Sequence, residues 1–203
     1  MPPIFALGAL VAVAGLLPGC AAPPRNPDDV CSVFSQRHAW YRATREAQQR
    51  WGIDQAIQMA VIFQESSFRA GARPPRTRLL GFIPWSRSSS AYGYAQVLNS
   101  TWDLYRRSAS RPRAERDRFP DAADFVGWYM DRIAEHAKID KSSARSLYLA
   151  YHEGAGGYGR GTHLTKRWLL DASRRVEKRA TRYGAQLSVC RERLERYRWW
   201  WPF

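Results

Sequence analysis

Cysteine, histidine and long apolar runs are scarce in this sequence. Its 203 residues include three cysteines and four histidines, and these form no Cys-x-x-Cys pair or Cys/His cluster with the spacing of a zinc site. We therefore predict no metal and no cofactor. The apolar run Ile4–Leu17 is shorter than the roughly 20 residues that a membrane-spanning helix needs.

Acidic residues and strand-like alternation are also in short supply. The chain has 18 Asp and Glu against 32 Lys and Arg, a net charge of +14, which predicts an anionic partner or surface. Nucleic acid, anionic lipid and an acidic cell-wall polymer would each satisfy that charge. Because no helix-turn-helix, zinc-finger or RNP pattern is present, we expect no nucleic-acid partner. No apolar/polar alternation extends beyond a few residues, so we predict a single, mainly α domain.

The start of the chain indicates export. The apolar run ends in Leu17-Pro18-Gly19, and an apolar segment that ends in a small residue is typical of a secretory signal, here residues 1–19. Leu17, Gly19 and Cys20 resemble a bacterial lipobox, in which the cysteine is lipidated. An ordinary cleaved signal is the alternative. Since Ala21 is not the Asp that retains lipoproteins at the inner membrane, we expect a lipid anchor on the periplasmic face of the outer membrane.

The segment 20–34 follows as the lipid-anchored cysteine and a Pro-rich, flexible tether. If Cys20 carries lipid, Cys31 and Cys190 remain, near the two ends of the predicted catalytic domain at 35–190. In an oxidising compartment they would form a disulfide. Closing so long a loop contributes on the order of 4–5 kcal/mol in the chain-entropy model.

Helical periodicity and turn signals divide the rest of the chain. Gly71–Ser90, with its prolines, glycines and serines, predicts a long loop or small hairpin. Its five arginines and its apolar residues suit either a surface insertion or a lip over a cleft. The expected helices are Ser35–Arg50, a central helix from an Asp54 N-cap to Glu65, Asn99–Arg107 capped by its own first hydroxyl side chains, Asp121–Ile139, Lys141–His152, Leu164–Gln186 and Leu187–Arg198.

The central helix, within Ile57–Ala70 (IQMAVIFQESSFRA), is apolar almost all round and should therefore be buried. Glu65 lies at its carboxyl end, where the helix dipole disfavours an ionised carboxylate. A carboxylic acid kept protonated in this way suits general-acid catalysis, although a lone Glu at a helix end is more often an ordinary surface residue.

Three short motifs change that balance: Glu65-Ser66-Ser67-Phe68, Gly93-Tyr94-Ala95-Gln96 and Ala150-Tyr151-His152-Glu153-Gly154. Their order and spacing resemble the soluble lytic transglycosylase (SLT) domain, a goose-lysozyme-like family whose signatures are usually written E-S-x-F, G-L-M-Q and A-Y-N-A-G. The resemblance covers roughly residues 51–186. It implies a lysozyme-like, mainly α fold with the Gly71–Ser90 loop or hairpin beside an active-site cleft.

The resemblance also implies a reaction. Glu65 would be the single catalytic acid and base. It would cleave the MurNAc–GlcNAc β-1,4 bond of peptidoglycan glycan strands and leave 1,6-anhydromuramoyl ends. The substrate-binding residues implied with it are Ser66, whose alternative role is local capping; Ser89 and Ser90, near the N-acetyl group; Gln96, on the cleft floor; Tyr151, beside the carboxyl; and Tyr183, reaching back from a late helix.

Two features leave alternatives open. His152-Glu153 replaces the Asn-Ala of the family pattern. Glu153 either has a local role, in which it caps the turn or pairs with an arginine, or it orients water and favours lysozyme-type hydrolysis. A catalytically silent peptidoglycan-binding lipoprotein is the non-enzymatic hypothesis. The basic and aromatic tail 191–203 suits either a membrane interface or packing on the domain beside Cys190.

Overall fold

Seven helices and one hairpin make up the described part of the chain. The computed structural model describes residues 22–79, 83–87 and 89–196, so Cys20 and the end of the tail lie outside the described residues. In chain order the elements are α1 (Val30–Gln36), α2 (His38–Trp51), α3 (Gln55–Ser66), β1 (Arg76–Leu79), β2 (Ile83–Arg87), α4 (Asn99–Ser108), α5 (Phe119–Ala137), α6 (Ala144–Gly159) and α7 (Arg167–Arg196). The predicted mainly α class is confirmed.

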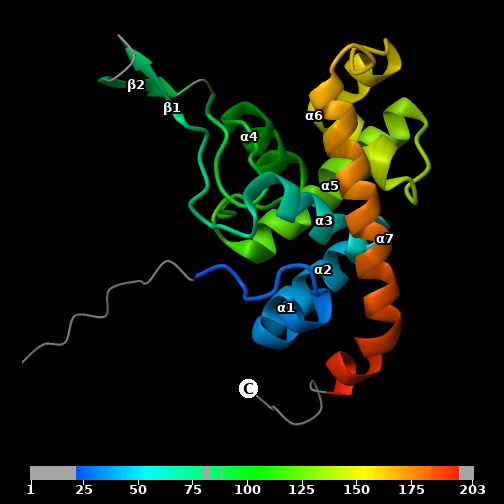
Figure 1. The fold of residues 1–203 in the computed structure, drawn as a ribbon. Coiled ribbons are helices and arrows are strands. Elements are labelled where there is room, and N and C mark those ends of the chain that lie inside the picture. The colour runs from blue at the N-terminus through cyan, green and yellow to red at the C-terminus, as the bar shows by residue number, and fades with distance from the viewer. Residues whose placement is uncertain (1–21, 80–82, 88, 197–203) are drawn as a thin grey trace, which may run out of the picture.

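Helix α3 lies at the centre of the fold. It packs against α7, α2 and α5, and Figure 1 shows it enclosed by them. Every residue from Gln55 to Ile62 is buried, as its apolar sequence predicts. The side chain of Asp54 accepts a hydrogen bond from the backbone N–H of Ala56, so the predicted N-cap is confirmed.

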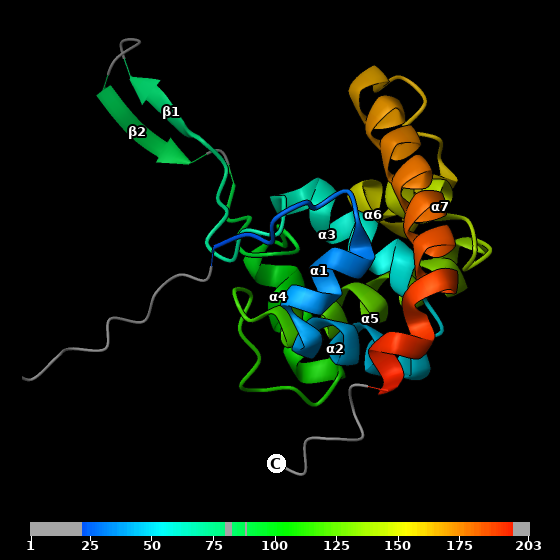
Figure 2. The same ribbon diagram turned by 60° about the horizontal axis from the view of Figure 1, so that its bottom comes forward.

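Helix α7 forms a long brace along one side of the molecule (Figures 1 and 2). It contacts α3, α6 and α1, and its buried face carries Leu169, Val176, Tyr183 and Leu187. The sequence predicted two helices here, divided at residue 187, but α7 is continuous because its apolar positions keep one helical period throughout. The described part of the tail, 191–196, is the carboxyl end of α7, and Leu194 there is buried.

The amino-terminal part of the domain begins earlier than predicted. The sequence assigned residues 20–34 to a tether, but Val30–Gln36 is helical, and the side chains of Val30, Val33 and Phe34 are wholly buried. Asp29 caps this helix by accepting from Cys31 and Ser32 N–H groups. Helix α1 ends at Gln36, and the non-helical backbone of Arg37 separates it from α2.

The disulfide between Cys31 and Cys190 joins α1 to α7. This pairing was predicted, and it is confirmed. It links positions 159 residues apart, and it therefore fixes the start of the domain against the end of the brace helix.

The segment predicted as a long loop or hairpin contains a two-stranded antiparallel hairpin. Arg76 pairs with Arg87 and Leu79 with Ile83, with an irregularity between Arg76 and Arg78. In Figures 1 and 2 the hairpin extends away from the helices. Whether it acts as a lip over a cleft stays a prediction. Among the described residues, no helix is both long and apolar enough to cross a bilayer.

Candidate functional site

Glu65 lies in the last turn of α3, where the helix stops abruptly. Ser67 and Phe68 both adopt left-handed backbone conformations, with φ of 51° and 61°. Such conformations cost energy in residues other than glycine and persist where the surroundings enforce them. Phe68 is 1 % exposed, and its burial holds the turn. The chain thus leaves the helix immediately after Glu65, whose side chain is 9 % exposed.

Two side chains from α6 meet the carboxylate of Glu65. The hydroxyl of Tyr148 donates to Glu65 Oε1 at 2.8 Å, and His152 Nε2 lies 3.3 Å from the same oxygen. His152 Nε2 also lies 3.0 Å from the Tyr148 hydroxyl oxygen. Tyr148 and His152 are four residues apart and share one face of α6. Glu65, Tyr148 and His152 therefore form one hydrogen-bonded cluster.

The proton inventory of this cluster fixes the roles of its members. A tyrosine hydroxyl has one proton, and Tyr148 uses it for the hydrogen bond that it donates to Glu65. The contact between His152 and Tyr148 then requires Nε2 to carry a hydrogen. Glu65 Oε1 consequently accepts from Tyr148, whose own oxygen accepts from His152. In the protonated acid Oε1 acts as the carbonyl oxygen, and the acidic proton resides on Oε2.

Burial, together with the neighbouring carboxylate, keeps the tyrosines of this region protonated. Burial, followed by the charge of Glu65, raises the pKa of Tyr148 far above its usual value, against a smaller opposite effect of Arg175. Burial and Glu65 likewise raise the pKa of Tyr151. Tyr148 is accordingly a permanent hydrogen-bond donor to Glu65 and takes no part as a base.

Tyr151 supports the second motif and does not bind Glu65 directly. Its hydroxyl donates to the Ala95 carbonyl at 2.8 Å, which fastens the Gly93–Gln96 turn to α6. The turn itself requires glycine. Gly93 has a φ of +81°, and a Cβ there would lie 2.1 Å from the Arg116 carbonyl oxygen.

Gln96 holds the same turn through its amide. Its Nε2 donates to the carbonyls of Ala72 and Gly93, at 2.9 and 2.7 Å. The amide oxygen is the group that these contacts leave available. The predicted contact of Gln96 with sugar stays a prediction, and in this structure the side chain ties the second motif to the segment that follows α3.

The predicted serines are occupied by local contacts. Ser66 is buried and donates to the Ile62 carbonyl within α3. Ser90 Oγ accepts from the backbone N–H of Asn99 at 3.1 Å, so it satisfies the first turn of α4, which has no side-chain cap of its own. The predicted capping by the first residues of α4 is therefore wrong. Ser89 Oγ accepts a long hydrogen bond from Ala91. Their contacts with substrate remain predictions.

Tyr183 is directed to the amino-terminal segment. Its hydroxyl donates to the Pro27 carbonyl and accepts from Arg179, and the residue is wholly buried. The guanidinium of Arg179 also covers the ring of Phe63, 3.6 Å from its centroid. These contacts of Tyr183 anchor the start of the domain to α7. The predicted contact of Tyr183 with Glu65 stays a prediction.

Glu153 is paired away from the cluster. It accepts from Lys166 Nζ at 2.7 and 2.8 Å and from the Thr162 hydroxyl. Lys166, followed by Thr162, lowers the pKa of Glu153. The partner is a lysine, where the sequence suggested an arginine. Helix α6 continues past Glu153 to Gly159, with a bend at Gly154 (φ 68°) in place of the predicted terminal turn.

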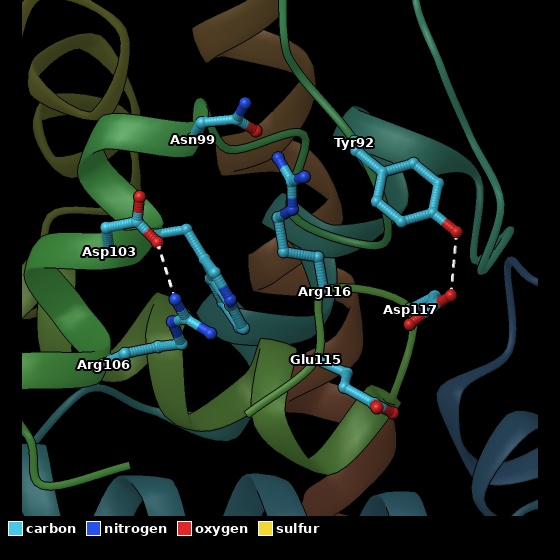
Figure 3. A pocket seen from close by; sticks show the side chains of 8 residues that line it. Tyr92, Asn99, Asp103, Arg106, Glu115, Arg116 and Asp117 are labelled. Atoms are coloured by element: carbon cyan, nitrogen blue, oxygen red, sulfur yellow. Dashed lines mark hydrogen bonds and ion pairs between the residues drawn. The ribbon is translucent and has the colours of Figure 1, made fainter. Parts of the chain in front are cut away.

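A separate cavity of about 510 Å³ lies between the start of α4 and the segment before α5. Figure 3 shows side chains of both charges around it. Most of them satisfy one another: Tyr92 donates to Asp117 at 2.7 Å, and Arg106 to Asp103 at 3.0 Å. Its lining includes neither Glu65 nor the α6 residues that contact it, so it is distinct from the cluster.

Tyr148 is the residue of the cluster that sequence analysis missed. It is 2 % exposed, as an ordinary core tyrosine is. The signal that could have revealed it is its spacing. Tyr148, Tyr151 and His152 recur at three and four residues, so a helix that presents Tyr151 and His152 near Glu65 also presents Tyr148.

Comparison with known protein families gives a match that includes all the elements of this site. A family model described as the transglycosylase SLT domain matches residues 8–190. The matched range includes α3 with Glu65, the Gly93–Gln96 turn and α6. Searches of curated proteins and of solved structures gave no match.

Proposed function

This chain belongs to the transglycosylase SLT domain family, and we propose that it cleaves the MurNAc–GlcNAc β-1,4 bond of peptidoglycan with Glu65 as acid and then base. The observation that carries the proposal is the Glu65 cluster. A largely buried carboxyl at a helix end has one oxygen held by Tyr148 and His152, which leaves the other for the substrate.

In the first step, Glu65 Oε2 gives its proton to the glycosidic oxygen as the bond to C1 of the muramoyl residue breaks. The substrate's acetamido carbonyl stabilises the positive charge that develops at C1. Tyr148 stabilises the carboxylate that forms, because its hydroxyl donates to Oε1 and itself accepts a hydrogen bond from His152.

In the second step, the Glu65 carboxylate takes the proton from the 6-hydroxyl of the same muramoyl residue. The 6-oxygen bonds to C1 and closes the 1,6-anhydro ring. Glu65 is again protonated, and no water is consumed. One carboxyl therefore performs both proton transfers, whereas ordinary glycosidases generally use two.

The pairing of Glu153 supports this chemistry over hydrolysis. Glu153 was the residue that favoured a lysozyme-type reaction, as an acid that could orient water. Lys166 and Thr162 occupy both of its oxygens. Of the acidic residues in the described ranges, Glu65 is the one whose contacts include Tyr148 and His152.

Digestion of purified sacculi tests the function. We expect the wild type to release muropeptides with anhydromuramoyl ends, identified by mass spectrometry, and Glu65→Gln to lose at least about a hundredfold in rate. Glu135→Gln, at an exposed position on α5, is the matched control and should keep full activity.

Other outcomes would identify the alternatives. Reducing ends as the main product would favour a lysozyme-type muramidase. A wild type that binds sacculi as well as Glu65→Gln does, and cleaves no faster, would favour a silent peptidoglycan-binding protein.

We further propose that Cys20 carries a lipid that anchors the protein to the periplasmic face of the outer membrane. The support is the signal-like segment 1–19 and the lipobox-like residues before Cys20. Incorporation of labelled palmitate and recovery in the outer-membrane fraction should both be lost in Cys20→Ala. Label that persists in Cys20→Ala would contradict the anchor.

A further inference from the structure

Trp168, in the first turn of α7, has a much larger exposed fraction than the tryptophans of the described core. Its exposed fraction is 58 %, whereas Trp40, Trp102 and Trp128 are each below 8 %. An indole has a large apolar area, so this degree of exposure leaves an apolar ring face in contact with water. The cleavage chemistry proposed for Glu65 does not use this residue.

The position of Trp168 places that ring beside the Glu65 cluster. Its ring centroid lies 5.4 Å from that of His152, with the planes at 87°, and His152 in turn lies 3.3 Å from Glu65. The indole is therefore one side chain away from the carboxylate. One imidazole in edge-to-face contact covers little of the indole, and the residue remains 58 % exposed.

The start of α7 holds the indole in place. Lys166, two residues before Trp168, is paired with Glu153, which joins the start of α7 to the bend in α6. Leu169, the next residue, is wholly buried. The backbone on either side of Trp168 is thus fixed, and a ligand that stacks on the ring would find it preorganised.

We propose that Trp168 is a carbohydrate-stacking platform that takes the apolar C–H face of an N-acetylated hexopyranose next to the bond cleaved at Glu65. The inference rests on the proposed function for the nature of the ligand, a glycan strand. It adds a binding site on α7 that the three sequence motifs do not contain.

The surroundings of Trp168 favour a sugar over an apolar protein partner. Lys166 and Arg167 precede the ring, and Asp171 and Arg174 lie on the next turn of α7. A single aromatic ring in a polar, mostly basic setting suits a pyranose, which has an apolar face and a hydroxylated rim. An apolar helix would need a wide apolar patch, whereas most of the residues around this ring in the sequence are charged.

The test uses a catalytically inactive background, so that binding is measured without cleavage. Titration calorimetry of Glu65→Gln with tetra-N-acetylchitotetraose gives the reference affinity. Adding Trp168→Ala should weaken binding about tenfold, the loss of one stacking contact, whereas adding Trp168→Phe should keep the affinity within about threefold. Adding Leu164→Ala, at a residue that is 67 % exposed, is the matched control and should leave the affinity unchanged.

Equal affinity in the Trp168→Ala and parent proteins would overturn the platform, as would a parent that does not bind the tetrasaccharide. Activity on sacculi separates this inference from the proposed function. In the active enzyme, Trp168→Ala should raise KM, with the ends of the products unchanged. Reducing ends from the wild type together with weaker binding by Trp168→Ala would reject transglycosylation and still support the platform.

Discussion

At the scale of single residues, the hydroxyl of Tyr148 has the most direct influence on Glu65. It donates to Oε1 at 2.8 Å, and its raised pKa keeps it protonated. Glu65 alternates between acid and carboxylate in the proposed reaction, and a fixed donor stabilises the carboxylate more than the acid. Tyr148 is thereby a positioning residue, whose effect should fall on the chemical step.

Tyr148→Phe should lower kcat on sacculi by about ten- to a hundredfold with little change in KM, because it removes a donor that strengthens as charge develops on Glu65. The ring and its packing are kept. Tyr41→Phe removes a hydroxyl that bonds Glu195 near the end of α7 and should keep wild-type kcat. A rise in KM alone in Tyr148→Phe would contradict the positioning role.

At the scale of elements, the bend of α6 and the start of α7 are held together by Glu153. Its carboxylate accepts hydrogen bonds from Lys166 and Thr162. Both residues lie in the segment that connects α6 to α7. The contacts of Glu153 hold the part of α6 that follows His152. They also hold the start of α7, which carries Trp168.

The stabilisation from Glu153 should depend on pH. Its folded-state pKa is depressed below the ordinary 4.5, so its contribution is complete above about 4.5 and is lost as the pH falls through the folded value. We expect the difference in melting temperature between wild type and Glu153→Gln to be largest near pH 7 and to narrow below pH 4.5. Exposed Glu135→Gln should show no such pattern, and a gap independent of pH would contradict the assignment.

A second prediction at this scale concerns the turn before α4. Gly93→Ala would force a Cβ to within 2.1 Å of the Arg116 carbonyl at a positive φ, so it should destabilise the protein by about 2 kcal/mol or more. Gly71→Ala, where a Cβ meets nothing within 4 Å, is the matched control. Equal denaturant midpoints for the two variants would contradict the tight turn.

At the scale of the whole molecule, α7 connects parts of the chain that are far apart in sequence. It packs on α3 and α6, which supply the Glu65 cluster, and the Cys31–Cys190 disulfide joins it to α1. The cross-link constrains the unfolded chain over a separation of 159 residues and should therefore stabilise the entire domain.

Removing both cysteines tests this effect. Cys31→Ser with Cys190→Ser should lower the free energy of unfolding by up to about 4–5 kcal/mol, measured by urea denaturation. A reducing agent should destabilise the wild type and leave the double variant unchanged. Stability of the double variant equal to that of the wild type would show that native strain offsets the loop closure.

Patterns local in the chain accounted for much of the fold. The apolar sequence of α3, its Asp54 cap and the amphipathic run of α5 each predicted a helix close to the one found. The errors lay at junctions. The helix predicted at Lys141–His152 was expected to end there, yet α6 bends at Gly154 and continues to Gly159. Glu153 contacts Thr162 and Lys166, which lie beyond the bend in the chain.

The helical class, the place of Glu65 at the end of a buried helix and the pairing of Cys31 with Cys190 could all be predicted from the amino-acid sequence. Each depends on periodicity, on a motif or on the small number of cysteines. The groups that contact Glu65 and the partners of Glu153 could be identified from the folded structure alone. Those contacts depend on the packing of α6 against its neighbours, and packing geometry is set by side chains far apart in the sequence that no local pattern brings together.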